Sequence, residues 1–159
     1  MTDLWTTVWA TIRQEFSDLA DAEQVTRVCV RLLVAITLGG LLGYERETKG
    51  VAAGLRTHML VALGAALFVL VPIQAGMTAP DMSRVIQGVV SGIGFLGAGA
   101  IIKLSQDREI RGVTTAASIW LTAAIGIAAG MGMELTAILS TLLALFILAT
   151  LHRGRTEPP

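Results

Sequence analysis

Residues with chemically active side chains gather at three places in this sequence, each where a long apolar stretch begins or ends. They are Glu45 and Arg46, then Arg56, Thr57 and His58, then Arg111, Thr114, Thr115 and Ser118. An arginine in apolar surroundings needs a carboxylate partner, so Glu45 is predicted to pair with Arg56 or Arg111. Thr57 and Thr115 are predicted to cap helix starts. Together these nine residues suggest a site for an ion or small anion. The alternative is basic anchoring combined with helix caps.

Metal and catalytic chemistry have weaker support in the sequence. Glu45, Glu47, Asp107 and Glu109 carry hard oxygen ligands that Mg2+ accepts, but neighbouring arginines would compete with a cation. His58 stands alone, where a histidine more often serves as a structural hydrogen-bonding group. We therefore predict no metal and no cofactor. The chain has no phosphate-binding glycine loop, no HExxH and no nucleophile elbow, so no enzymatic activity is predicted.

The segments that position these residues are apolar enough to lie in lipid. The 159 residues are 53% hydrophobic and 15% charged, with a mean hydropathy of +0.69. Five stretches approach the length needed to cross a bilayer, at residues 28–44, 57–77, 85–102, 113–133 and 135–151. The fold class predicted is an all-α transmembrane bundle of five spans. The formal net charge is zero, which gives no indication of a nucleic-acid partner.

The predicted organisation has three parts. Residues 1–21 form an interfacial amphipathic helix, residues 22–151 the five-helix transmembrane domain, and residues 152–159 a short cytoplasmic tail. The first part places Trp5 and Trp9 at headgroup depth on an apolar side that repeats every three or four residues. Asp21 is predicted to cap the next helix, because Gln24 follows it three residues later. Arg31 is expected to snorkel outward or to pair with Glu23 on its own helix.

Basic residues predict the orientation of the chain. One side of the five-span arrangement carries Arg46, Lys49, Arg56, Lys103, Arg108, Arg111, Arg153 and Arg155, whereas the other carries Arg84, Arg13 and Arg27. Because lysine and arginine favour the cytoplasmic side, we expect the N-terminus outside and the C-terminus inside a bacterial inner membrane. The chemically active residues at the ends of the apolar stretches would then face the cytoplasm.

Glycines predict where helices pack. Small-xxx-small pairs occur at Gly39 and Gly43, Gly88 and Gly92, and Gly126 and Gly130, with further glycines at Gly94, Gly97 and Gly99. Because the third stretch has glycines on two sides, we predict that it is the central helix. The alternative is a locally broken helix around residues 94–99 that lines a cavity.

A weak internal repeat relates the two halves of this region. The segment Gly40-Leu-Leu-Gly43, a charged loop and Gly54-Leu-Arg-Thr57 resemble Gly94-Phe-Leu-Gly97, a charged loop and Gly112-Val-Thr-Thr115. We interpret the first two and the next two spans as parallel structural repeats. Chance similarity between glycine-rich helices is the alternative.

Several ordered blocks of the sequence resemble the MgtC/SapB family of bacterial inner-membrane proteins. They are Gly43-Tyr-Glu-Arg46, Ala53-Gly-Leu-Arg-Thr-His58 with Leu60-Val-Ala-Leu-Gly64, Ser91-Gly-Ile-Gly-Phe-Leu-Gly-Ala-Gly99, and Arg111-Gly-Val-Thr-Thr-Ala-Ala-Ser-Ile-Trp120 with Ala123-Ala-Ile-Gly126. They cover roughly residues 32–132, and their order makes the resemblance specific.

The resemblance implies a role in adaptation to low magnesium and, in pathogens, in virulence. It also implies contacts with other membrane proteins, such as the ATP synthase, or self-association in the lipid bilayer. The competing hypothesis is a small transporter or channel for Mg2+ or another ion that works as an oligomer. About eight residues follow Leu151, so we expect this short form to lack the ACT-like domain of longer members.

Overall fold

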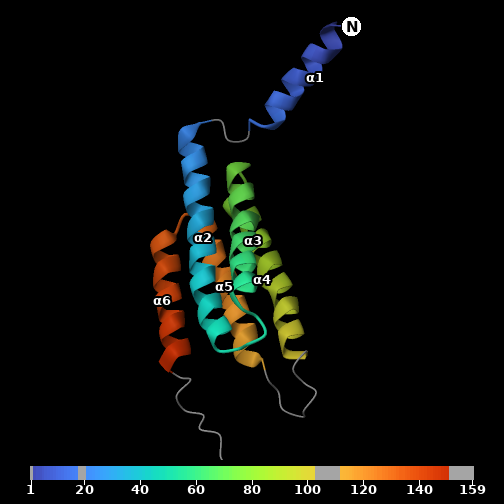
Figure 1. Ribbon diagram of the computed structural model, residues 1–159. Helices are drawn as coiled ribbons and strands as arrows, with labels where there is room; N and C mark the ends of the chain where they lie inside the picture. Colours follow the sequence, from blue (N-terminus) through green and yellow to red (C-terminus); the bar gives the residue numbers. More distant parts are fainter. Residues whose placement is uncertain (1, 18–20, 103–111, 151–159) are drawn as a thin grey trace, which may run out of the picture. The chain divides into compact units, whose positions relative to one another are not determined.

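The computed structural model describes residues 2–17, 21–102 and 112–150. All regular structure within these ranges is helical. The helices are α1 (Thr2–Glu15), α2 (Ala22–Thr48), α3 (Leu55–Gln74), α4 (Ala79–Ile102), α5 (Val113–Gly130) and α6 (Glu134–Thr150) (Figure 1). The chain divides into two compact units, residues 1–30 and 31–159.

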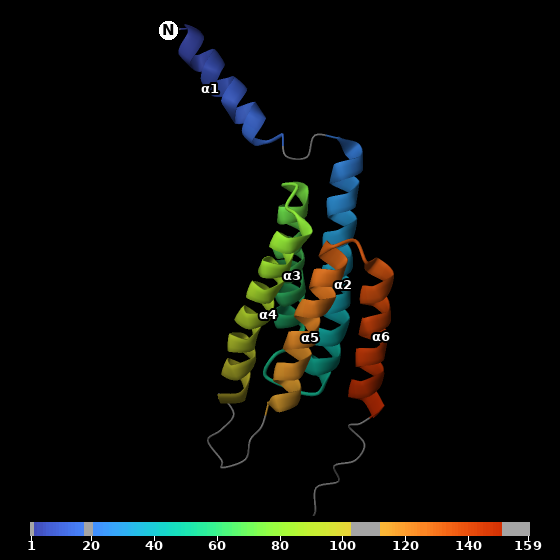
Figure 2. The same cartoon turned by 180° about the vertical axis from the view of Figure 1, so that it is seen from behind.

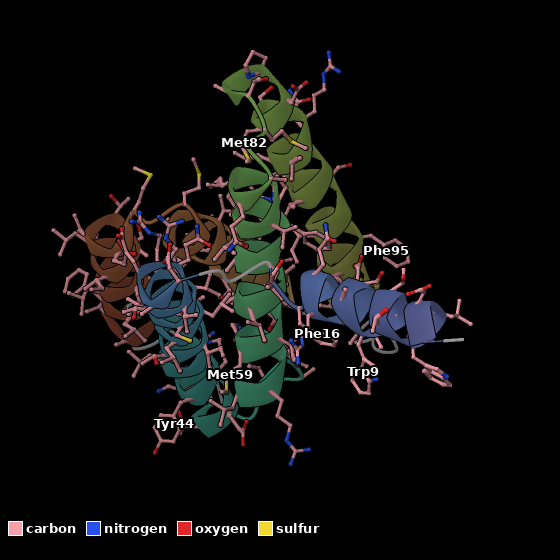
Figure 3. The ribbon with its side chains drawn as sticks, turned by 90° about the horizontal axis from the view of Figure 1, so that it is seen from above. Trp9, Phe16, Tyr44, Met59, Met82 and Phe95 are labelled. Carbon is pink, nitrogen blue, oxygen red and sulfur yellow. The ribbon has the colours of Figure 1, made fainter. Side chains whose placement is uncertain are left out.

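The first unit contains α1 and the beginning of α2. The backbone N–H of Gln24 donates to Asp21 Oδ1 at 2.7 Å, which confirms that Asp21 caps α2. Arg27 and Glu23 form an exposed ion pair one helical turn apart. The apolar side chains of α1, such as Trp9, are exposed, and so is Phe16 just after the helix (Figure 3).

The second unit is a bundle of helices that alternate in direction (Figures 1 and 2). Four of the described helices, α2 to α5, are long and apolar enough to cross a membrane. The fifth, α6, is apolar but has 17 residues, about 25 Å of helix at 1.5 Å per residue. The predicted helical membrane bundle is confirmed, with a last helix shorter than the others.

The central helix of the bundle is α5. It contacts α3, α4 and α6, and its Ile125 and Ala129 share a core with Ala35 of α2 and Ala62 of α3. Half of the most apolar window of α5 is buried, against 11% of that of α4. The prediction that the third stretch is central is therefore wrong. Abundant glycine permits close packing on a helix face, but it does not determine whether a neighbour occupies that face.

Glycines of α2 and α5 allow the helices to touch through their backbones. A Cβ added to Gly126 would stand 2.9 Å from Ala62 Cα, and one added to Gly130 would stand 2.8 Å from Ala66 Cα. On α2, a Cβ at Gly39 would stand 2.7 Å from Ala62 Cβ, and one at Gly43 would stand 2.7 Å from Leu55 Cα. Such close approach gains dispersion contact that lipid chains cannot match.

The glycines of α4 have different surroundings. Among the described residues, no atom lies within 4 Å of a Cβ built on Gly88, Gly92, Gly94 or Gly99. At Gly97 a Cβ would make ordinary contact with Ala116 at 3.5 Å. The structure therefore uses one glycine of α4 for packing against α5, and the other four have no such neighbour within the described ranges.

Arg31 joins α2 to the end of α5. Its Nη1 donates to the carbonyl oxygen of Gly130 at 3.2 Å, and its guanidinium lies against Gly132 in the turn between α5 and α6. Gly132 has a φ of +79°, a conformation that favours glycine. Arg31 therefore does not pair with Glu23, which binds Arg27 instead, because its guanidinium supplies a donor for the Gly130 carbonyl at the end of α5. The outward direction of Arg31 stays a prediction.

The contacts of the two helix hairpins match the predicted repeat. Gly43 approaches His58 across α2 and α3, and Gly97 approaches Ala116 across α4 and α5. These four residues occupy corresponding positions in the repeated sequence. The contact at Gly43 is closer than the one at Gly97, and the parallel repeat stays a prediction.

The backbone contact at Gly126 predicts a stability difference between two glycine substitutions. We expect Gly126→Ala to lower the free energy of unfolding by roughly 1–3 kcal/mol, because the new methyl group must push α3 away. Gly64→Ala is the matched control, since no described atom lies within 4 Å of its added Cβ. Unfolding measured in bicelles would contradict this packing if both variants were equally stable.

Candidate functional site: the polar end of the bundle

Buried polar side chains collect at the end of the bundle where α2 ends and where α3 and α5 begin (Figure 1). The set comprises Glu45 and Arg46 from α2, His58 from α3, and Thr115 and Ser118 from α5. These five residues are hereafter called the polar cluster. Each comes from the first or last turns of its helix, so the helix packing described above brings them together.

His58 connects α3 to α5. Its imidazole is completely buried, with Nδ1 2.9 Å from the carbonyl oxygen of Gly54 and Nε2 3.1 Å from Ser118 Oγ. A carbonyl oxygen only accepts hydrogen bonds, so Nδ1 carries the hydrogen. The other nitrogen faces a hydroxyl group, which both donates and accepts.

Ser118 allows the imidazole to be paired in either protonation state. Its hydroxyl also lies 2.8 Å from the carbonyl oxygen of Thr115. With a neutral ring, the hydroxyl donates to Nε2 of His58. With a protonated ring, Nε2 donates to Ser118, whose hydroxyl then donates to Thr115. The arrangement can therefore hold a proton without leaving a ring nitrogen unpaired.

Glu45 and Arg46 form a buried ion pair beside the imidazole. Arg46 Nε donates to Glu45 Oε2, and the two side chains are 6% and 16% exposed. Both charges act electrostatically on His58. Among the described residues, Glu45 Oε1 is a buried oxygen without a hydrogen-bond partner. An unpaired oxygen of this kind requires a water molecule, an ion or another donor.

The structure brings together only part of the predicted cluster. Arg46, His58 and Thr115 are buried and Glu45 is half-buried, whereas Arg56, Thr57 and Thr114 are exposed. Arg111 lies outside the described residues. The predicted pairing of Glu45 with Arg56 is wrong, because the adjacent Arg46 turns into the bundle and takes the carboxylate.

The predicted threonine caps are also wrong. The N-cap residues of α3 and α5 are Gly54 and Gly112, and neither helix has a side-chain hydrogen bond from its cap. In the first turn of α3, the backbone N–H of Leu55 instead donates a hydrogen bond to Glu47 Oε2 at 2.8 Å. This contact depends on the fold of the connecting loop, so no local sequence signal revealed it.

Metal ligands do not gather in the described part of the chain. Within those residues, no three His, Cys, Asp or Glu side chains are placed to hold an ion together. What the polar cluster offers is a buried proton-accepting imidazole, an ion pair and one unsatisfied carboxylate oxygen.

These features define a polytopic α-helical membrane protein with a polar site at one end of its bundle. The MgtC family model matches residues 32–156, so the chain belongs to the MgtC family, as its ordered blocks predicted. It is 42% identical over 134 residues to protein SrpB of Synechococcus elongatus, covering 77% of this chain and 74% of that protein.

Two further relatives are longer than the region they share with this chain. The putative magnesium transporter YhiD of Escherichia coli is 40% identical over 131 residues, covering 78% of this chain and 60% of YhiD. Protein MgtC of Salmonella typhimurium is 44% identical over 117 residues, covering 73% of this chain and 48% of MgtC. The chain thus spans about half the length of Salmonella MgtC. No solved structure matches the chain.

The bond between His58 and Ser118 predicts a coupling energy. We expect Ser118→Ala to cost roughly 1–3 kcal/mol of stability, because it leaves a buried ring nitrogen unpaired. In a His58→Leu background the same change should cost much less, giving a coupling of about 1 kcal/mol. Unfolding in bicelles measures the cycle, with exposed Thr114→Ala as a control. Additive effects of the two substitutions would contradict the bond.

Proposed function

We propose that this protein is a non-enzymatic component of a bacterial inner membrane that supports adaptation to low Mg2+ by contacting other membrane proteins. Membership of the MgtC family supports the connection with magnesium, as does the name of its relative YhiD, the putative magnesium transporter of Escherichia coli. In a pathogen, the same activity would contribute to virulence. The excess of basic residues on one side supports an outside N-terminus and a cytoplasmic C-terminus.

The observation that carries this proposal is the outward face of α4. Gly88, Gly92 and Gly99 lie on one side of this helix at spacings of four and seven residues, and all three are exposed. Phe95, on the same side, is 82% exposed and points away from α3 and α5 (Figure 3). A glycine face offers lipid little to contact, whereas another helix can approach it closely.

Polar side chains beside this face favour a protein partner over lipid. Gln87 and Ser91 are exposed on α4, and neither has a hydrogen-bond partner among the described residues. An unpaired amide or hydroxyl group in hydrocarbon is unfavourable, and a neighbouring helix could supply its partner. The α4 face therefore combines close backbone access with hydrogen-bonding groups.

The proposal predicts the effect of filling the α4 face. Gly88→Leu combined with Gly92→Leu should leave the bundle as stable as the parent, because no described atom lies near either position. The double variant should fail to restore growth at low Mg2+ to a strain that lacks the native protein. Gly64→Leu on α3 is the matched control and should restore growth. Normal growth with the double variant, at equal membrane abundance, would reject the α4 face as the acting surface.

A second candidate function is a small ion transporter or channel, working as an oligomer. The buried and unpaired Glu45 Oε1 favours it, because a passing cation could use this oxygen. Glu45→Gln keeps the size of the side chain and removes its charge. If the chain conducts Mg2+, vesicles containing the parent should take up Mg2+ and those containing Glu45→Gln should not. If neither the parent nor Glu45→Gln vesicles take up Mg2+, the transport function is rejected and the contact with other membrane proteins remains.

A further inference from the structure

Helix α1 exposes a continuous apolar side. Leu4, Trp5, Val8, Trp9 and Ile12 recur every three or four residues, and Phe16 continues the pattern just beyond the helix. Trp5 is 67% exposed, Trp9 61% and Phe16 83%. Three large aromatic rings in contact with water would be unfavourable, so this side requires a partner.

The opposite side of α1 carries hydroxyl groups and few charges. Thr7 Oγ1 donates to the Asp3 carbonyl at 2.7 Å, and Thr11 Oγ1 donates to the Thr7 carbonyl at 2.9 Å. The helix contains one basic residue, Arg13, and two acidic ones, Asp3 and Glu15. Attraction to anionic lipids requires several lysines or arginines, which α1 does not contain.

The connection to α2 keeps α1 close to a bilayer. The chain takes seven steps from Glu15 to Ala22, and at about 3.5 Å per step the connection reaches at most about 25 Å. Since α2 is a membrane span, lipid is always within reach of the apolar side of α1. A separate protein would have to compete with this tethered surface.

We propose that α1 inserts its apolar side into the lipid–water interface through gaps between lipid headgroups, and that its insertion depends on lipid packing and not on lipid charge. Trp5 and Trp9 supply bulky rings that fill such gaps, and indole prefers headgroup depth. The threonine side remains at the level of the headgroups. Looser packing offers more gaps, so α1 responds to the state of the bilayer in which the bundle resides.

The test uses the full chain with Trp120→Phe, so that only Trp5 and Trp9 fluoresce. The protein is reconstituted in dioleoylphosphatidylcholine vesicles with lipids brominated near the glycerol or near the chain end. We expect shallow bromine to quench about twofold more than deep bromine. Adding dioleoylglycerol, which loosens packing, should increase quenching. Replacing part of the lipid with dioleoylphosphatidylglycerol, or adding salt, should leave it unchanged.

Two variants serve as controls for this measurement. Trp5→Phe combined with Trp9→Phe retains Trp120 of α5, whose quenching should not respond to dioleoylglycerol. Val8→Asp in the Trp120→Phe chain interrupts the apolar side and should abolish shallow quenching without changing the stability of the bundle. Quenching that needs anionic lipid or disappears in salt would overturn the proposal. The proposal would also be overturned if Trp5 and Trp9 were shielded from bromine in every lipid, because a second copy of the chain or another protein would then cover them.

Discussion

The close approach of α5 to α3 is the contact on which the rest of the bundle depends. Gly126 and Gly130 carry no side chain where they meet Ala62 and Ala66, so two backbones touch over a full turn of each helix. Lipid tails are as apolar as leucine side chains, and burial of apolar area alone therefore gives little association in a membrane. Dispersion between closely packed backbones provides much of the attraction instead.

This contact also determines the position of the polar cluster. Once α5 lies against α3, Ser118 comes within 3.1 Å of the His58 imidazole, and the Glu45–Arg46 pair at the end of α2 belongs to the same cluster. At the other end of α5, Arg31 satisfies the carbonyl oxygen of Gly130. The central helix is thus held by backbone contact along its length and by polar side chains near both ends.

The bundle uses its small residues selectively. Glycines of α5 and α2 are covered by neighbours, whereas most glycines of α4 have no neighbour in the described chain. The closest backbone contacts among the described residues therefore lie on α2, α3 and α5, whereas α4 contributes only Gly97.

The sequence by itself determined the helical class, the apolar segments, the cap at Asp21 and the family, because these depend on composition, periodicity and ordered local blocks. It also placed the members of the polar cluster near the ends of apolar segments, since charged residues are excluded from the middle of a span, but it did not separate them from the exposed Arg56, Thr57 and Thr114. Only the tertiary structure decided that α5 is central, that Glu45 pairs with Arg46, that Glu47 serves α3 and that Arg31 reaches Gly130. Each of these depends on which helix faces meet, and glycine faces with similar spacing on α4 and α5 cannot be distinguished until the helices pack.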